Sequence, residues 1–389
     1  MTEAQVLVLV VGLVYLWECL AWVPRASVIF RAFGAGPARV LDGNGLPGFA
    51  PAGVVLGDPL PPFGLLLVTS WLPVSLAPGG AYSYVGFAFN PGTRPRQAER
   101  YVRFEAMRSV EARDRDVFVN GERFVRVASP RLAAHVAATL GLLRSLPDHR
   151  RAARIEAAIT ASLDAGAIRD TLDSYARHAR VLRWLSAGLL AWLLLIAPVV
   201  FMLLGIAATW PWILAGLLAL VGAVAWRYAI AHGRLFPGAG RDRWGAIAGM
   251  VLFPPAAVRA PLILSRDLLA TYHPMAIAFA VSAPGAARSL AEGLVLDARH
   301  PIAPVCPPEA PDDAREAAAW FHSRMRAALE AFLEKTPGGG LAPDAPPGAA
   351  EHDARSYCPR CRSQYRVPAG SCPDCGGLPL VLLDKTVAV

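Results

Sequence analysis

The sequence predicts a multi-domain membrane protein with about three α-helical transmembrane spans, an inserted cytoplasmic α+β domain and a small cysteine-containing module at its C-terminus. Three observations predict this organisation. Of the 389 residues, 54% are hydrophobic and only 17% are charged, which is too apolar for an ordinary soluble chain. Several apolar runs are long enough to cross a bilayer. Two Cys-x-x-Cys pairs lie near the C-terminus.

The chain is basic, with 38 Lys and Arg residues, 30 Asp and Glu residues and a net charge of +8. Lysine occurs only at Lys335 and Lys385. Many arginines flank the apolar segments, where they act as determinants of topology, so the charge does not by itself predict nucleic-acid binding. A chain rich in Arg, Ala, Gly and Pro with so little lysine is typical of a GC-rich bacterial genome. We therefore expect a multi-pass protein of the bacterial inner membrane.

Residues 1–24 are predicted to form an N-terminal transmembrane helix. The apolar run from Val6 to Val23 reaches roughly 27 Å as a helix, close to the thickness of a hydrocarbon core. It lacks the positively charged start and the small-residue cleavage site of a signal peptide. We therefore expect a retained span with its N-terminus outside.

Residues 184–228 are predicted to form a transmembrane helical hairpin, because the apolar runs 184–207 and 209–226 are separated only by a turn around Ala208, Thr209 and Pro211. Arginines flank the hairpin and are absent from its turn, which places both outer ends in the cytoplasm. The flanking residues are Arg177, Arg180, Arg183, Arg227, Arg234, Arg241 and Arg243. Arg25 and Arg31 mark the same side after the first span.

Residues 229–311 are predicted to form interfacial or membrane-packed helices. The stretch 244–281 is strongly apolar, but Pro254, Pro255 and Arg266 interrupt it, so neither half makes a clean span. The alternative is that this stretch makes one more span. In that case everything after it would lie outside.

Residues 25–148 are predicted to form a cytoplasmic β-rich domain with a closing helix. Its first half has β-branched and aromatic runs separated by Gly and Pro clusters. Asn120-Gly121 stands between two further β runs and supplies the positive φ angles of a type I′ hairpin turn. Ser129 and Pro130 then have the pattern of an N-cap and a first helical residue.

Residues 149–183 are predicted to form an amphipathic helical stalk that leads into the bilayer. Its basic residues Arg150, Arg151 and Arg154 are candidates for binding anionic lipid headgroups. A solvated helix face is the alternative, because basic faces are expected near membranes.

After the membrane region, residues 312–336 are predicted to form an amphipathic helix with apolar positions at Ala317, Trp320, Met325, Leu329 and Phe332. The stretch 337–354 is rich in Gly, Pro and Ala and has no periodicity, so we expect a flexible linker. Such a tether lets an attached module search the space around it.

Residues 355–389 carry the most specific motif of the chain, Cys358-Pro-Arg-Cys361 followed by Cys372-Pro-Asp-Cys375. Each Cys-x-x-Cys knuckle aims two thiolates at one ion, and two knuckles complete a tetrahedral shell. Four thiolates leave no open coordination position, so the site is expected to be structural. A pair of disulfides and a rubredoxin-like iron centre are alternatives that use the same residues.

The module resembles the zinc-ribbon family over about Ser356 to Leu383. The resemblance is to short bacterial ribbons with Cys-Pro-x-Cys-Gly knuckles. It implies structural zinc held by Cys358, Cys361, Cys372 and Cys375. Arg362 departs from the pattern, because it stands where the first knuckle usually has glycine. No family is recognised for the rest of the chain.

Few other residues suggest chemistry. Glu18 is an ionisable residue within an apolar run and so an intramembrane candidate, although near the cytoplasmic surface it can snorkel or pair with Arg25. The sequence has no nucleotide-binding loop, nucleophile elbow, metalloprotease helix or paired catalytic carboxylates, so no catalytic residue is predicted.

Two classes of function remain. The favoured one is a non-enzymatic membrane scaffold or adaptor whose cytoplasmic ribbon recruits a protein partner. The alternative is a redox or transport component, in which an iron-loaded ribbon passes electrons or Glu18 and the hairpin line a path. Nucleic acid is a less favoured partner, because the ribbon lacks a basic patch with interleaved aromatic residues.

Overall fold

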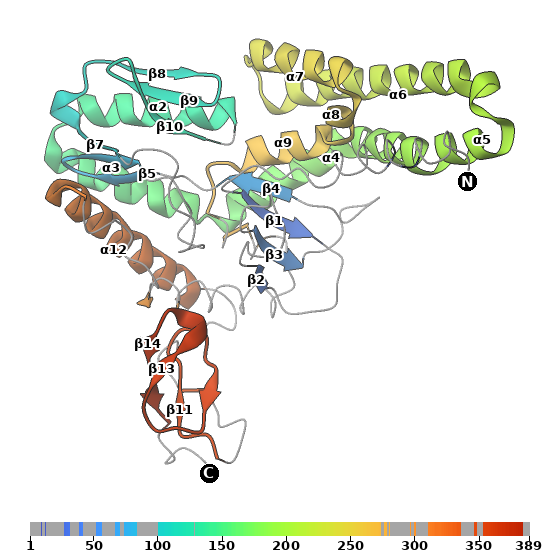
Figure 1. Ribbon diagram of the computed structural model, residues 1–389. Coiled ribbons are helices and arrows are strands. Elements are labelled where there is room, and N and C mark those ends of the chain that lie inside the picture. Colours follow the sequence, from blue (N-terminus) through green and yellow to red (C-terminus); the bar gives the residue numbers. More distant parts are fainter. Residues whose placement is uncertain are drawn as a thin grey trace.

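The structure is a computed structural model of the whole chain (Figure 1). It describes Leu9, Gly12, Ala280 and the residues 27–31, 39–41, 52–56, 67–70, 74–83, 100–127, 129–273, 276–277, 296, 299–300, 310–335, 346–347 and 353–383. Leu9 and Gly12 are helical, and the rest of the predicted first span lies outside the described residues. The same holds for most of the predicted linker.

Four strands near the N-terminus form one sheet in the order β2-β3-β1-β4. They are β1 (Ser27–Arg31), β2 (Arg39–Leu41), β3 (Ala52–Leu56) and β4 (Leu67–Ser70). β1 pairs with β3 in parallel and with β4 in antiparallel orientation. β4 lies against helix α9 (Ala260–Leu269), so this sheet packs beside the helices that follow the hairpin rather than with the other strands (Figure 1).

Two antiparallel three-stranded sheets follow, in the orders β5-β6-β7 and β10-β9-β8. Their strands are β5 (Val74–Ala77), β6 (Gly80–Ser83), β7 (Arg100–Arg103), β8 (Val110–Arg113), β9 (Asp116–Val119) and β10 (Glu122–Arg126), with a short 3-10 helix η1 (Phe104–Ala106) after β7. The predicted Asn120-Gly121 hairpin is confirmed, because β9 pairs with β10 and the two residues have φ angles of 55° and 81°. The Asn120 side chain also accepts a hydrogen bond from the Arg108 amide, at 2.6 Å.

Helix α2 (Pro130–Ser145) closes these sheets. Its predicted start is confirmed, because the Ser129 hydroxyl accepts a hydrogen bond from the Leu132 amide and Pro130 is the first helical residue. The apolar face of the helix is buried against the strands. Apolar residues three or four apart on the helix and alternate apolar residues on the strands therefore form one common core. That core includes Val74, Leu76, Phe104, Val117, Val119, Phe124, Leu132, Val136, Leu140 and Leu143.

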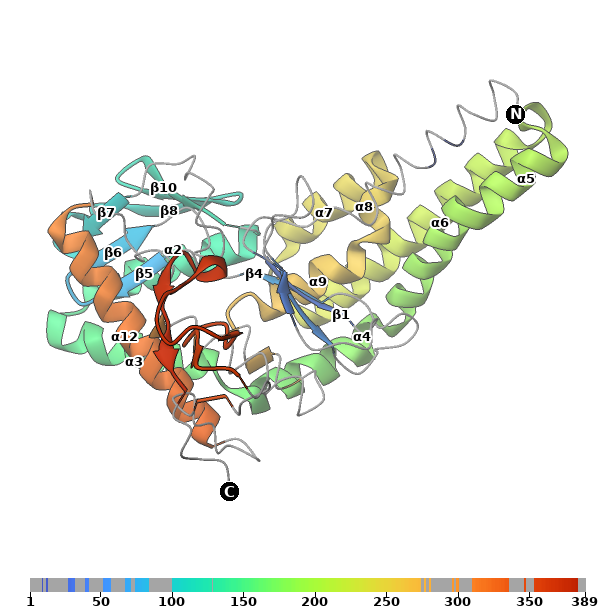
Figure 2. The ribbon, with the colours of Figure 1, turned by 60° about the horizontal axis from the view of Figure 1, so that its bottom comes forward.

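Helices α3 (Asp148–Ser162) and α12 (Asp312–Glu334) complete the same unit. This unit, made of β5 to β10, α2, α3 and α12, is called the β domain below. Ile155 and Ile159 of α3 are buried in its core, so α3 belongs to the domain rather than to the predicted stalk. α12 lies across β5 and β6 and contacts α3 (Figures 1 and 2). Ion pairs join Arg103 to Asp313 and Arg324 to Glu156, the latter at 3.2 Å. A helix that follows the sheet by about 210 residues in the sequence therefore covers it.

The hairpin consists of two long helical segments that lie side by side and end together, away from the β domain (Figures 1 and 2). The first comprises α4 (Ala165–Ala191), a π-helical turn (Trp192–Ile196) and α5 (Ala197–Leu204). The second is α6 (Ile206–Leu235). Pro198 has no amide hydrogen for the Leu194 carbonyl, which accounts for an irregular turn at this place.

The turn between the two segments is at Gly205, not at the predicted residues 208–211. Gly205 has a φ of 81°, which costs a residue without Cβ little. Thr209 and Pro211 instead lie in the first turns of α6. Trp192 packs so closely on α6 that a Cβ on Gly216 would be 2.3 Å from its ring, and small residues permit such close helix contact.

Both segments are long and apolar enough to cross a membrane. Only 11% and 22% of their most apolar windows are buried, whereas the core helix of a soluble protein is mostly buried. Large apolar side chains are therefore exposed around the far end of the hairpin. They include Leu195, Met202, Leu203, Leu204, Trp210, Trp212 and Leu218.

Helices α7 (Gly240–Leu252), α8 (Pro254–Val258) and α9 follow the hairpin and pack along it. At 1.5 Å per residue none reaches the roughly 30 Å of a hydrocarbon core. Met250, Leu264 and Leu269 are fully buried in the cluster that holds α4 to α6. The Tyr175 hydroxyl of α4 donates a hydrogen bond to the Pro261 carbonyl at 3.0 Å, which further ties α9 to the hairpin.

Candidate metal centre

The C-terminal module is built from short antiparallel strands. β11 (Ser356–Tyr357) pairs with β12 (Gln364–Tyr365) and β15 (Val381–Leu382), and β13 (Ser371–Cys372) pairs with β14 (Leu378–Pro379). The first knuckle joins β11 to β12, and the second leaves β13 through the 3-10 turn η3 (Pro373–Cys375). Sequence-adjacent hairpins thus carry the two cysteine pairs toward each other.

The structure brings all four cysteines together. Every pair of their sulfur atoms lies within 4.8 Å, and the Sγ atoms of Cys361 and Cys372 are 3.7 Å apart. Cys358, Cys372 and Cys375 are buried, and Cys361 is exposed. All four are free thiols rather than disulfides.

The donor set fits a tetrahedral metal ion. Zinc–sulfur bonds of ≈2.3 Å place the sulfur atoms of a tetrahedral shell about 3.8 Å apart, close to the separation of Cys361 and Cys372. The four cysteines could therefore bind one metal ion. Thiolates are ligands of both zinc and iron, so the geometry does not distinguish the two metals.

The environment of Cys372 favours its ionised form. Burial alone raises the pKa of a thiol, but hydrogen bonds from Tyr365 and from the neighbouring thiols lower the pKa of Cys372 to about 7. The Tyr365 hydroxyl donates to Cys372 Sγ at 3.1 Å. Burial raises the pKa of Cys358 and of Cys375. A bound cation would offset that cost, because metal binding and thiol deprotonation are linked.

Both knuckles need a left-handed residue directly after their second cysteine. Gly376 has a φ of 64°, and Arg362 occupies the equivalent place with a φ of 60°. At Arg362 the chain turns so that its amide donates to the Cys358 carbonyl at 2.9 Å. A residue with Cβ pays roughly 1 kcal/mol or more for this conformation, so the first knuckle is the less relaxed of the two.

We expect Arg362→Gly to raise the affinity for zinc about fivefold, because relief of about 1 kcal/mol of backbone strain adds to a linked equilibrium of folding and metal binding. Gly376→Ala should lower it by a similar factor. A chelator competition titration on the full chain under reducing conditions measures both. Arg362→Ala is the control, because it removes the charge and keeps the strain; a rise equal to that of Arg362→Gly would contradict the explanation.

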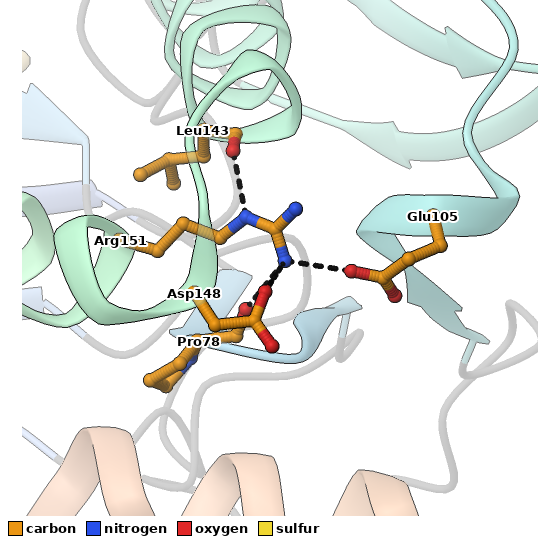
Figure 3. Close-up of polar contacts among 5 residues, drawn as sticks. All are labelled: Pro78, Glu105, Leu143, Asp148 and Arg151. Atoms are coloured by element: carbon orange, nitrogen blue, oxygen red, sulfur yellow. Dashed lines mark hydrogen bonds and ion pairs between the residues drawn. The ribbon is translucent and has the colours of Figure 1, made fainter.

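One proposed headgroup ligand is corrected by the structure. Arg151 is buried, and its guanidinium points into the β domain (Figure 3). Nε donates to the Leu143 carbonyl at 2.9 Å, and Nη1 lies 3.0 Å from the Pro78 carbonyl, 2.8 Å from Glu105 and 2.6 Å from Asp148. Arg151 therefore joins α3 to α2, to the turn between β5 and β6 and to η1, and does not reach a lipid headgroup.

The other candidates named from the sequence are Arg150, Arg154 and Glu18. Arg150 and Arg154 are exposed on α3, and Arg154 borders a largely apolar cavity of about 190 Å³ between α2, α3 and α12. Their role in lipid binding stays a prediction. Glu18 lies outside the described residues. The buried network of Arg151 was not found from the sequence, because the partners Pro78 and Glu105 are 73 and 46 residues away from Arg151.

The chain matches no protein-family model, and no curated protein or solved structure is similar to it.

Proposed function

We propose that the chain is a membrane-anchored scaffold or adaptor with a structural zinc ribbon that recruits a protein partner. The observation that carries this proposal is the pairing of two separate features. One is a helical hairpin with an exposed apolar surface, and the other is a metal-binding module with a small core of its own around Cys358, Cys372 and Cys375. The hairpin suits anchoring of the chain in a membrane, and the metal-binding module suits recognition by a protein partner.

The packing of α12 supports a hairpin that enters and leaves a membrane on one side. α12 follows the hairpin in sequence and packs on β5 and β6, which precede it. The His273 amide, just after α9, also donates to the Ser162 carbonyl at the end of α3, at 2.8 Å. The end of α3, before the hairpin, and the start of α12, after it, must then lie on the same side of a bilayer. This requires an even number of spans, which two long helices provide and an additional span over 244–281 would not.

The ribbon supports recruitment rather than catalysis. Four thiolates fill a tetrahedral shell and leave no position for a substrate. A module of this size cannot bury a sufficient core without metal, so the ion supplies folding free energy. Val367 and Leu382 remain exposed on its surface, where a partner could cover them. An iron-loaded ribbon is the redox alternative, and visible charge-transfer absorption of the purified chain would favour it over colourless zinc.

We expect a proximity-labelling enzyme fused after Val389 to label cytoplasmic proteins, because the arginines that flank the hairpin favour a cytoplasmic location for its outer ends. A subset of these neighbours should be lost in Cys372→Ser, whose ribbon cannot fold, with at least a fivefold drop in recovery. Membrane insertion and expression should not change.

Cys306→Ser is the matched control, because it removes a cysteine outside the four-cysteine cluster. It should leave the labelled set unchanged. Labelling of periplasmic proteins would overturn the topology, and an identical set in Cys372→Ser and the parent chain would overturn recruitment by the ribbon.

A further inference from the structure

A second hollow, distant in sequence from the ribbon, lies where α6 ends and α7 begins. It has a volume of about 280 Å³ and is lined by His232 and Gly233 of α6, by Phe236, Gly238 and Ala239 of the turn, and by Gly240 and Arg243 of α7. The turn is compact because Gly238 has a φ of 90°. Glycines on both sides leave room for a ligand to approach the backbone.

His232 is the most informative residue of this hollow. It is only 4% exposed, and its Nδ1 has no hydrogen-bond partner among the described residues. A buried polar atom without a partner costs free energy, so such atoms are rare unless a ligand or water completes them. The ring is held in place by Tyr228 and Phe236, whose centroids lie 5.5 Å and 4.9 Å from it.

Two arginines bring positive charge to the neighbourhood of this hollow. Arg243 of α7 lines it, and its Nε is also buried without a partner among the described residues. Its Nη1 lies against Gly233, where an added Cβ would be 3.2 Å away. Arg131 of α2 stacks on Phe236 with its guanidinium carbon 3.9 Å from the ring centroid. One guanidinium group thus lines the hollow, and a second stacks on its lining residue Phe236.

The N-terminus of α7 adds backbone donors. The N-cap residue Ala239 has no side chain that could accept from the first amides, which no carbonyl of the same helix can reach. These amides and the helix dipole favour an anion at this end. The nearby turn carbonyls of His232, Phe236 and Ala239 already accept hydrogen bonds from Phe236, Ala239 and Arg243, at 2.8, 3.3 and 3.3 Å. Asp242 is the acidic side chain of the turn, and it is exposed.

The position of the hollow suits the headgroup layer of a bilayer. The exposed apolar surface of α6 ends at Trp226 and Arg227 follows. His232 lies six residues beyond Trp226, or about 9 Å along a helix. The polar layer on each side of a hydrocarbon core is roughly 5–8 Å thick, so the hollow lies at the outer edge of this layer. A phosphate at that depth would meet the unpartnered atoms of His232 and Arg243.

We propose that this hollow, formed by His232, Gly233, Arg243 and the first turn of α7, binds a phosphate-type anion. The ligand is a phosphomonoester or phosphodiester group, and its source is either an anionic phospholipid headgroup or a free phosphate. The proposal does not depend on the ribbon. Neither His232 nor the turn of α7 is part of the predicted headgroup site on α3, so this site is separate from Arg150 and Arg154.

The test uses the full chain in detergent with two probes, phosphatidylglycerol followed by native mass spectrometry and inorganic phosphate followed by calorimetry. We expect Arg243→Gln and His232→Gln each to weaken binding roughly tenfold, since each removes a hydrogen bond to a charged group. Asp242→Asn should strengthen it, because an opposing charge is lost. Arg234→Gln is the matched control, since Arg234 is an exposed cation of α6, the helix of His232, and does not line the hollow.

Binding of phosphatidylglycerol but not of inorganic phosphate would identify a lipid headgroup site, and binding of both would identify a general phosphate site. The proposal is overturned if neither probe binds, or if Arg234→Gln weakens binding as much as Arg243→Gln. Should His232→Gln fail to fold, Arg243→Gln and Asp242→Asn still decide, because their opposite charge changes must shift affinity in opposite directions.

Discussion

Replacement of Cys372 by serine is expected to lower the affinity of the chain for zinc by roughly a hundredfold. Structural zinc sites bind with about 10–16 kcal/mol, so each of four thiolates accounts for about 3 kcal/mol on average. Because the ribbon folds only with its metal, the loss should appear as local unfolding of residues 355–383. Metal analysis and hydrogen exchange of the full chain measure the two effects.

The other three cysteines of the cluster should behave alike, since the four sulfur atoms form one set within 4.8 Å. Cys306→Ser is again the control and should retain stoichiometric metal. Acidification should release the ion from the parent chain, because protons compete with it for the thiolates. A Cys372→Ser variant that keeps the metal with unchanged affinity would refute the assignment of these cysteines as one site.

The second large effect is expected for Arg151→Met, which should destabilise the β domain by about 2–4 kcal/mol. The substitution removes the side-chain donor of the Pro78 carbonyl and one of the two donors of the Leu143 carbonyl, which keeps the Leu146 amide at 3.2 Å. It also removes the cation that lies 4.9 Å from the Phe104 ring. The hydrogen bond from Arg151 also lowers the pKa of Glu105. Because Glu105 is exposed, water screens most of that interaction, and the lost carbonyl partners dominate.

Hydrogen exchange of the full chain in nanodiscs measures this effect, as faster exchange of β5, α2 and α3 by roughly a hundredfold. Arg151→Lys should recover less than half of the stability, because an ammonium cannot bridge the same acceptors as a planar guanidinium. Arg150→Met is the matched control and should change stability by under about 0.5 kcal/mol, since the neighbouring residue is exposed. Equal effects of the two substitutions would show that the buried network contributes nothing.

The sequence by itself determined those features whose physical cause is local. The two Cys-x-x-Cys knuckles, the Asn120-Gly121 turn and the Ser129 cap each depend on a few neighbouring residues, and the structure has all of them. The two long apolar helices are likewise a property of composition over a window, so they were predicted, although their turn lies at Gly205. The turn forms at Gly205, which adopts a positive φ at little cost, and not near Pro211, where proline predicted it.

Only the tertiary structure decided which distant segments meet. Arg151 shares the i, i+4, i+8 face of Ile155 and Ile159, but it is separated from Pro78 by 73 residues and from Glu105 by 46, so nothing within α3 shows which groups its guanidinium meets. The same reason applies to α12, whose amphipathic face was predicted without its partner strands. It also applies to Arg131 beside the hollow of His232 and Arg243. Periodicity shows that a face is buried, and packing alone determines against what.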